Sequence, residues 1–153
     1  MPSRLRGGAL RLAGWLWAAP CTALGLAVAV VVVLLRGSAR RFAGTLEVVL
    51  PQRRAARGPA ASLNPWGAFT LGHVIIATSP RDLEQLRAHE REHVRQYERW
   101  GALLAVAFAV SSLWQVLRGR HPYWDNRFEV EARRRCGEER PGSGPPAWPG
   151  PAA

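Results

Sequence analysis

The segment His89-Glu90-Arg91-Glu92-His93 has the form H-E-x-x-H, in which two histidines four residues apart enclose a glutamate. On a helix, residues four apart lie on the same face, about one turn from each other. Two imidazoles so placed can bind one zinc ion, and the adjacent carboxylate can act as general base toward a zinc-bound water. The motif therefore predicts zinc as the cofactor, with His89 and His93 as ligands.

The same five residues also fit the inverted form H-x-x-E-H, in which Glu92 would be the base. At about 100° per residue, Glu90 falls on the side of the helix that holds the apolar residues, whereas Glu92 falls among glutamines and arginines. A carboxylate in apolar surroundings has a raised pKa, which suits a general base. We therefore predict Glu90 as the catalytic residue and Glu92 as a surface residue.

The motif must be presented by a helix that ends near Trp100. Ser79 is a good N-cap, Pro80 fits the first helical position and Asp82 suits the first turn. No glycine or further proline interrupts the segment before Trp100. The sequence therefore predicts one well-capped helix over residues 79–100.

Two apolar stretches precede this helix. Residues 44–50 predict a short strand that ends at Pro51, and residues 68–77 predict a second strand that ends before Ser79. Residues 52–65 are rich in Arg, Ala, Gly and Pro and predict a surface loop. His73 lies alone in the second stretch, and a lone strand histidine is more often structural than catalytic.

The N-terminal region contains 24 consecutive uncharged residues, from Leu12 to Leu35. This length can cross a bilayer as a helix, and Trp15 and Trp17 suit a membrane interface. A cleaved signal peptide is the alternative interpretation, but the residues after Arg36 offer no clean cleavage site. We predict a retained single-pass anchor, located in the bacterial inner membrane.

The composition limits the partners. The chain has 153 residues and a formal net charge of +10, and all its basic residues are arginine. It contains no zinc knuckle, helix-turn-helix or RNA-binding signature, so no nucleic-acid partner is expected. The expected partners are the lipid bilayer, whose surface is anionic, and a peptide or protein substrate. Cys21 and Cys136 lie outside any zinc-site spacing.

A catalytic zinc ion takes three protein ligands and one water. Arg99 occupies the position of the third histidine of the metzincin pattern, and Gln96 that of its glycine, which excludes that class. The remaining candidates follow the second apolar run. They are Asp125, Glu129 and Glu131, with His121 as a nitrogen alternative.

A resemblance helps to choose among them. A β-branched strand, a Ser-capped helix with Leu-x-x-H-E-x-x-H, an apolar segment and then Glu-x-x-Ala resembles the minimal core of gluzincin peptidases. It looks most like the membrane-bound HtpX-like and prenyl-protein (CAAX) proteases, over roughly residues 66–134. In those enzymes the third ligand is a Glu followed three residues later by Ala and then Asp. The resemblance implies Glu129 as third ligand, with Glu131 as second choice; Arg133 replaces the Asp.

The predicted fold class is α+β, with an N-terminal transmembrane helix followed by a minimal zincin-like core. The predicted domains are a membrane anchor over residues 1–41, a zincin-like domain over 42–136 and a disordered Pro/Gly-rich tail over 137–153. The predicted function is that of a membrane-anchored zinc metallopeptidase. The alternatives are a non-catalytic membrane protein that retains the fold, and an Arg-rich membrane-surface adaptor.

Residues 101–117 form a second uncharged run, and as a helix they would rise about 25 Å. A single crossing of the membrane would leave the two histidines and Glu129 on opposite sides, where they could not share a metal at about 2 Å. We therefore predict that this segment is a buried or interfacial helix and does not cross.

Overall fold

The computed structural model describes residues 2–51 and 67–138, with side chains from residue 12 onward. The predicted loop over residues 52–65 and most of the predicted tail lie outside this range. The chain divides into two compact units, Met1–Ala102 and Leu103–Ala153. The first unit contains α1 (Pro2–Leu34), β1 (Ser38–Phe42), β2 (Thr45–Val49), β3 (Ala68–Leu71), β4 (Val74–Ala77) and α2 (Pro80–Trp100).

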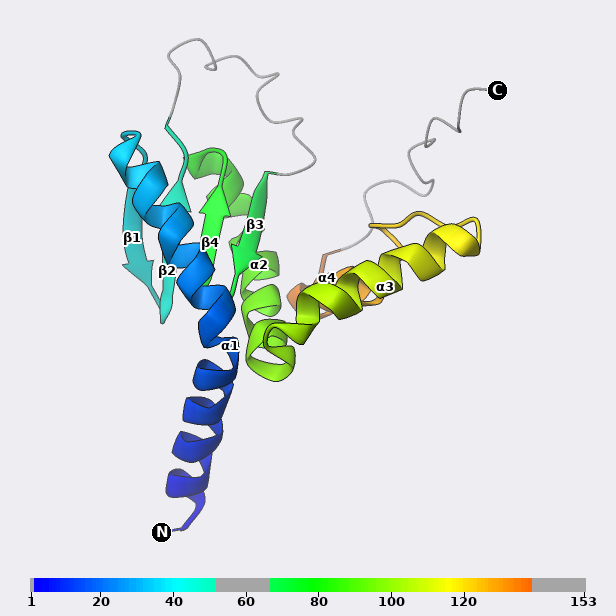
Figure 1. Cartoon of the computed structure of the whole chain (residues 1–153), viewed down its shortest axis with the longest axis horizontal. Helices are drawn as coiled ribbons and strands as arrows, with labels where there is room; N and C mark the ends of the chain where they lie inside the picture. The colour runs from blue at the N-terminus through cyan, green and yellow to red at the C-terminus, as the bar shows by residue number, and fades with distance from the viewer. Residues whose placement is uncertain (1, 52–66, 139–153) are drawn as a thin grey trace. The chain divides into compact units, whose positions relative to one another are not determined.

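The four strands of the first unit form one sheet in the order β1-β2-β4-β3 (Figure 1). β2 and β4 run parallel in the middle, while β1 and β3 pair antiparallel with them at the edges. The described chain is therefore mixed α+β, with an N-terminal apolar helix and a small four-stranded sheet.

The structure corrects the strand predictions. The first predicted strand is confirmed as β2, but the stretch over residues 68–77 is a hairpin of two strands and not one strand. Gly72, which has a φ of +60°, and His73 make the turn between them. A β-carbon rarely tolerates this φ, so the glycine permits the reversal. β1 was not predicted, because its arginines resembled a charged boundary after the apolar run.

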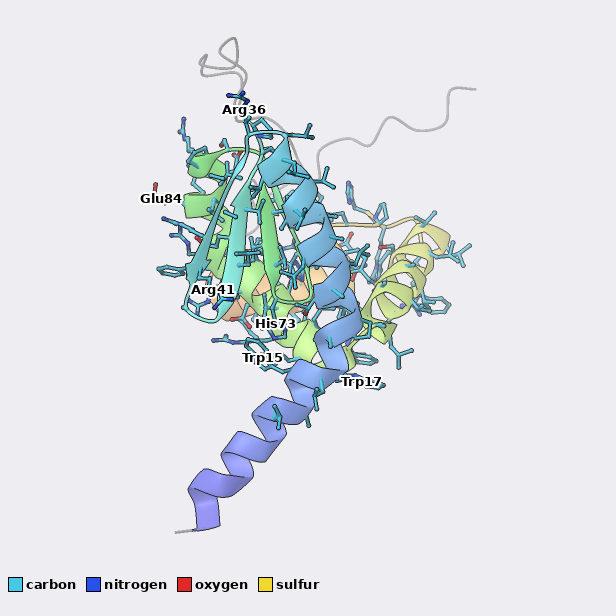
Figure 2. The ribbon with its side chains drawn as sticks, turned by 60° about the vertical axis from the view of Figure 1, so that its left-hand side comes forward. Trp15, Trp17, Arg36, Arg41, His73 and Glu84 are labelled. Atoms are coloured by element: carbon cyan, nitrogen blue, oxygen red, sulfur yellow. The ribbon has the colours of Figure 1, made fainter. Side chains whose placement is uncertain are left out.

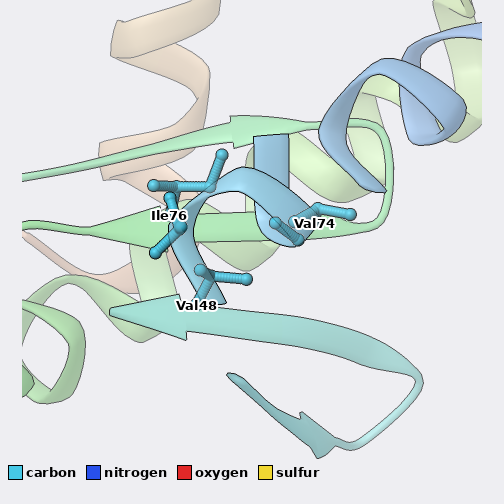
Figure 3. Close-up of a cluster of buried hydrophobic side chains, with 5 residues drawn as sticks. Val48, Val74 and Ile76 are labelled. Carbon is cyan, nitrogen blue, oxygen red and sulfur yellow. The ribbon is translucent and has the colours of Figure 1, made fainter. Parts of the chain in front are cut away.

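Residues of the central strands point alternately to the two faces of the sheet, as a strand period of two requires. Val48, Val74 and Ile76 form one buried cluster with Ala29 and Val32 of α1 (Figure 3). On the other face, Val49, Ile75 and Ala77 form a second cluster with Leu83 and Val94 of α2. The sheet therefore lies between α1 and α2 (Figure 1 and Figure 2).

The helix α1 is part of this core and is also apolar enough to enter a membrane. Among the described residues, Leu12–Leu34 is the one single helix whose length and composition suffice for a crossing. Retained anchors and signal sequences share these properties. The expected domain boundary at residue 41 stays a prediction, although α1 packs within the same unit as the sheet.

Gly25 allows the close approach of α1 to the sheet. A β-carbon at this position would lie 2.7 Å from the main-chain oxygen of Leu71 and 2.8 Å from Cβ of Val74. Because such distances are shorter than van der Waals contact, any larger side chain must push the helix away from the sheet.

Replacing Gly25 with leucine is expected to destabilise the first unit by about 1–3 kcal/mol, the usual cost of overpacking a core. Thermal unfolding of the detergent-solubilised protein would measure the loss. Leu24→Ala is the matched control, since Leu24 is 58% exposed. Equal melting temperatures for Gly25→Leu and the wild type would contradict the packing of α1 against the sheet.

A buried carboxylate joins β1, β2 and α2. Glu47 is 1% exposed and accepts hydrogen bonds from Nε of Arg40 at 2.9 Å and Nε of Arg87 at 2.7 Å. Two guanidinium partners offset the cost of burying its charge. The pairing fixes α2 across the sheet, so that the motif helix has a defined position.

The second unit contains α3 (Leu103–Leu117) and α4 (Arg127–Cys136). Phe108 of α3 stacks on Phe128 of α4, with ring centroids 6.2 Å apart. The buried Asn126 caps α4 by accepting from the Phe128 N–H, and its amide nitrogen donates to Ser112 Oγ at 2.7 Å. Asn126 therefore both caps the start of α4 and bonds it to α3.

Candidate metal centre

The motif helix α2 has the predicted start and end. The Ser79 side chain accepts from the Asp82 N–H, Pro80 occupies the first turn, and the helix ends at Trp100. The hydroxyls of Thr78 and Ser79 each donate to Asp82 Oδ2 at 2.6 Å, which fixes the capping carboxylate. These contacts fix where α2 begins.

The two histidines of the motif face each other. Their Nε2 atoms are 3.1 Å apart, His89 is buried with 4% exposure, and His93 is half-buried. Two nitrogens bound to one tetrahedral zinc at about 2.05 Å would be about 3.3 Å apart. The pair therefore already has close to the spacing that a shared metal requires, and both belong to sets of side chains that could hold a metal ion.

Gln96 contacts the ring of His93. Its Oε1 lies 2.9 Å from Nδ1 of His93, and Gln96 is itself 4% exposed. An amide oxygen accepts, so this contact favours the tautomer with the proton on Nδ1, in which the lone pair of Nε2 points toward His89. Metal-binding histidines are commonly oriented by such a partner. The role of Gln96 was not predicted, although the i, i+3 spacing on a helix would have suggested it.

Glu90 is buried, as predicted, with 4% exposure. The Thr70 hydroxyl of β3 donates to its Oε2 at 2.7 Å and also lies 3.2 Å from its main-chain oxygen. The Glu90 carboxylate is therefore held in place by a hydroxyl from the edge strand β3. Burial raises the pKa of the nearby Tyr97 to about 12, with smaller contributions from Cys21 and Glu90, so the phenol of Tyr97 stays neutral. No pattern in the sequence indicated a role for Thr70.

The prediction that Glu92 lies on the surface is wrong. Glu92 is 5% exposed, nearly as buried as Glu90, and it pairs with Arg95. The prediction from helical phase treated one helix in isolation, whereas the burial of Glu92 depends on all the elements packed around that helix. The preference for Glu90 therefore no longer follows from exposure. It rests instead on Thr70, which holds the Glu90 carboxylate.

The candidates for a third ligand all lie in the second unit. Glu129 is 3% exposed and lies 3.5 Å from Nη1 of Arg133, whereas Glu131 pairs with the exposed Arg135 at 2.7 Å. His121 and Asp125 stabilise the loop before α4. The His121 ring accepts from the N–H groups of Tyr123 and Trp124, and Asp125 accepts from the His121 N–H.

His73 has a structural environment. It is 5% exposed, and its ring lies between Thr22 of α1 and Glu98 of α2, 2.9 Å and 3.3 Å away. Trp15 stacks on it with ring centroids 4.1 Å apart (Figure 2). The turn histidine therefore joins three elements of the first unit.

Comparison of the chain with protein-family models, with curated proteins and with solved structures finds no match.

Proposed function

We propose that this protein is a zinc-dependent peptidase of the gluzincin type that works at a membrane. The observation that supports this most is the pair of Nε2 atoms of His89 and His93, 3.1 Å apart, beside the buried Glu90. When bound there, zinc would supply a Lewis acid for a water molecule and a peptide carbonyl.

The residues of the chain would supply the remaining chemistry. Glu90 is the base that takes the proton of the attacking water and passes it to the leaving amine. Thr70 keeps the carboxylate oriented, with its hydroxyl 2.7 Å from Oε2. Gln96 keeps His93 in the tautomer that can bind a metal.

The edge strand β3 supports a peptide as substrate. β3 pairs with β4 on one side only, and it contributes Thr70 to the candidate base. An extended peptide can add to such an edge through main-chain hydrogen bonds. This addition would bring a substrate backbone alongside the residues of α2 that are proposed to act on it.

The third ligand stays a prediction from the family resemblance. Glu129 is favoured over Glu131, because Glu129 is buried near one arginine while Glu131 is partly exposed and paired with another. Glu129→Gln should lower zinc binding more than Glu131→Gln does. Equal zinc binding in both variants would remove the choice of Glu129.

Metal removal tests the proposed function. Purified protein in detergent is expected to contain about one zinc ion per chain, and to cleave unstructured peptides. A chelator should abolish the cleavage and added zinc should restore it. Bound zinc with no cleavage of any peptide would favour the non-catalytic alternative. Absence of both zinc and cleavage would favour the membrane-surface adaptor.

The membrane part of the proposal depends on α1. The segment Leu12–Leu34 is long and apolar enough to enter a bilayer. Location in a bacterial inner membrane remains a prediction. Which face of α1 can contact lipid depends on which face packs against the sheet.

A further inference from the structure

One face of α1 packs against the rest of the first unit. Its members recur every three or four residues, as a helical stripe requires. They contact the sheet, the β3–β4 turn and α2. They are Gly14, Ala18, Thr22, Gly25, Ala29 and Val32. The contact therefore extends along most of the apolar segment and is not confined to one end.

Polar groups lie level with the middle of this helix. Thr22 Oγ1 is 2.9 Å from Nδ1 of His73, and Nε2 of His73 is 3.3 Å from Glu98 Oε1. The side chain of Glu98 is 37% exposed, and it lines a hollow together with Arg91 and Arg95 of α2. Charged and solvent-accessible side chains therefore lie beside α1 between Gly14 and Thr22.

The opposite face of α1 is apolar and exposed. No charged residue occurs between Leu12 and Leu35. The exposed side chains include Leu16 at 67%, Leu24 at 58% and Val31 at 55%. At about 100° per residue these three fall within about 80° of one another. Such a continuous apolar surface is unusual in contact with water.

These two faces conflict with a simple crossing. A hydrocarbon layer around a spanning α1 would also have to surround the groups packed against α1. These are Glu98, the arginines beside it and a sheet whose edge strands, among the described residues, are β1 and β3. Open sheet edges do not occur in contact with lipid chains, and charged side chains are costly there. The packed helix can therefore expose only its outer face to lipid.

We propose that α1 lies in the plane of a membrane surface, with Leu16, Leu24 and Val31 in the lipid and the sheet on the water side. This deepens the membrane part of the proposed function and does not depend on zinc. Trp15 and Trp17, 47% and 51% exposed, suit the headgroup level. Arg36 is exposed just beyond the end of α1 and Arg41 is exposed at the far end of β1 (Figure 2), and the net charge of +10 favours an anionic lipid surface.

The second unit has an independent feature of the same kind. Ser111 and Ser112 of α3 face α4, where they bond the Arg127 N–H and the Asn126 amide. The outer face of α3 is apolar and exposed, and its 15 residues are too few for a crossing. Its large members are Leu103, Val106, Val110, Leu113 and Leu117. Polar groups turned inward and apolar groups outward are the pattern of a helix that faces lipid.

Depth measurements distinguish the in-plane arrangement from a crossing. A fluorophore would be attached at Leu16→Cys, Leu24→Cys or Val31→Cys in full-length protein that lacks Cys21 and Cys136. The protein would be reconstituted in vesicles of phosphatidylcholine and phosphatidylglycerol that contain nitroxide lipids of known depth. Equal depth near the headgroups is expected at all three positions. Glu84→Cys, on the exposed part of α2, is the control and should stay unquenched.

A crossing helix would give a different profile. Leu16 and Val31 are about 22 Å apart along the axis, so the label at Leu24 would be deepest, by about 11 Å. That result would overturn the proposal. Absence of quenching at all three sites, with disulfide cross-links between chains at Leu24→Cys, would also overturn it by placing a second copy on this face. The zinc content of the same samples reports separately on the proposed function.

Discussion

Replacing His89 or His93 with alanine is expected to remove the zinc from the purified protein. Each substitution deletes one of two nitrogens that lie 3.1 Å apart. Loss of a ligand should weaken binding more than about 100-fold, the upper end of what losing an orienting partner costs. Elemental analysis after gel filtration would show about one zinc ion per wild-type chain and almost none in either variant.

Gln96→Leu provides an intermediate case for the same measurement. It keeps both nitrogens but removes the acceptor at Nδ1 of His93, so a loss of about 10–100-fold in zinc affinity is expected. His121→Ala is the matched histidine control, because that ring bonds the main chain of its own loop. Equal zinc content in His89→Ala, His121→Ala and the wild type would eliminate the metal site.

Glu90→Gln is expected to leave zinc bound while lowering the rate of hydrolysis by about 10²–10⁴-fold, the usual contribution of a general base. Glutamine keeps the size of the side chain and can still accept the Thr70 hydroxyl, but it cannot take a proton from water. Cleavage rates at saturating peptide, measured beside zinc content, would separate loss of chemistry from loss of metal.

Glu92→Gln is the control for Glu90→Gln, since both residues lie on α2 and are buried to nearly the same extent. We expect Glu92→Gln to retain zinc and most of the activity. An equal loss of activity in the two variants would contradict the assignment of Glu90 as the base. Activity that survives Glu90→Gln would exclude that residue as the base.

The motif helix could be predicted from the sequence because its signals are local. Ser79, Pro80 and Asp82 each act within the first turn, and the apolar pattern extends to Trp100. The hairpin was missed for a different reason. An apolar run over residues 68–77 resembles one buried strand, and only Gly72 and its positive φ mark the reversal.

The environment of the candidate site could not be predicted in the same way. Thr70 reaches Glu90 from an edge strand, so this contact depends on how the sheet packs against α2. The burial of Glu92 likewise arises from tertiary packing and not from helical phase. The helical phase predicts which residues share a face of α2. It does not predict which of these faces the rest of the protein covers.

The parallel pairing of β2 with β4 determines when the sheet can form during synthesis of the chain. The centre of the sheet cannot close until β4 has left the ribosome, which happens well after α1 and β2 have emerged. During that interval Ala29 and Val32 lack Val74 and Ile76, their partners on β4. The insertion machinery of a membrane would meet α1 as a bare apolar helix, before the strands that must cover one side of it exist. In the proposed in-plane arrangement, the inner face of α1 must therefore stay clear of lipid until the hairpin is made.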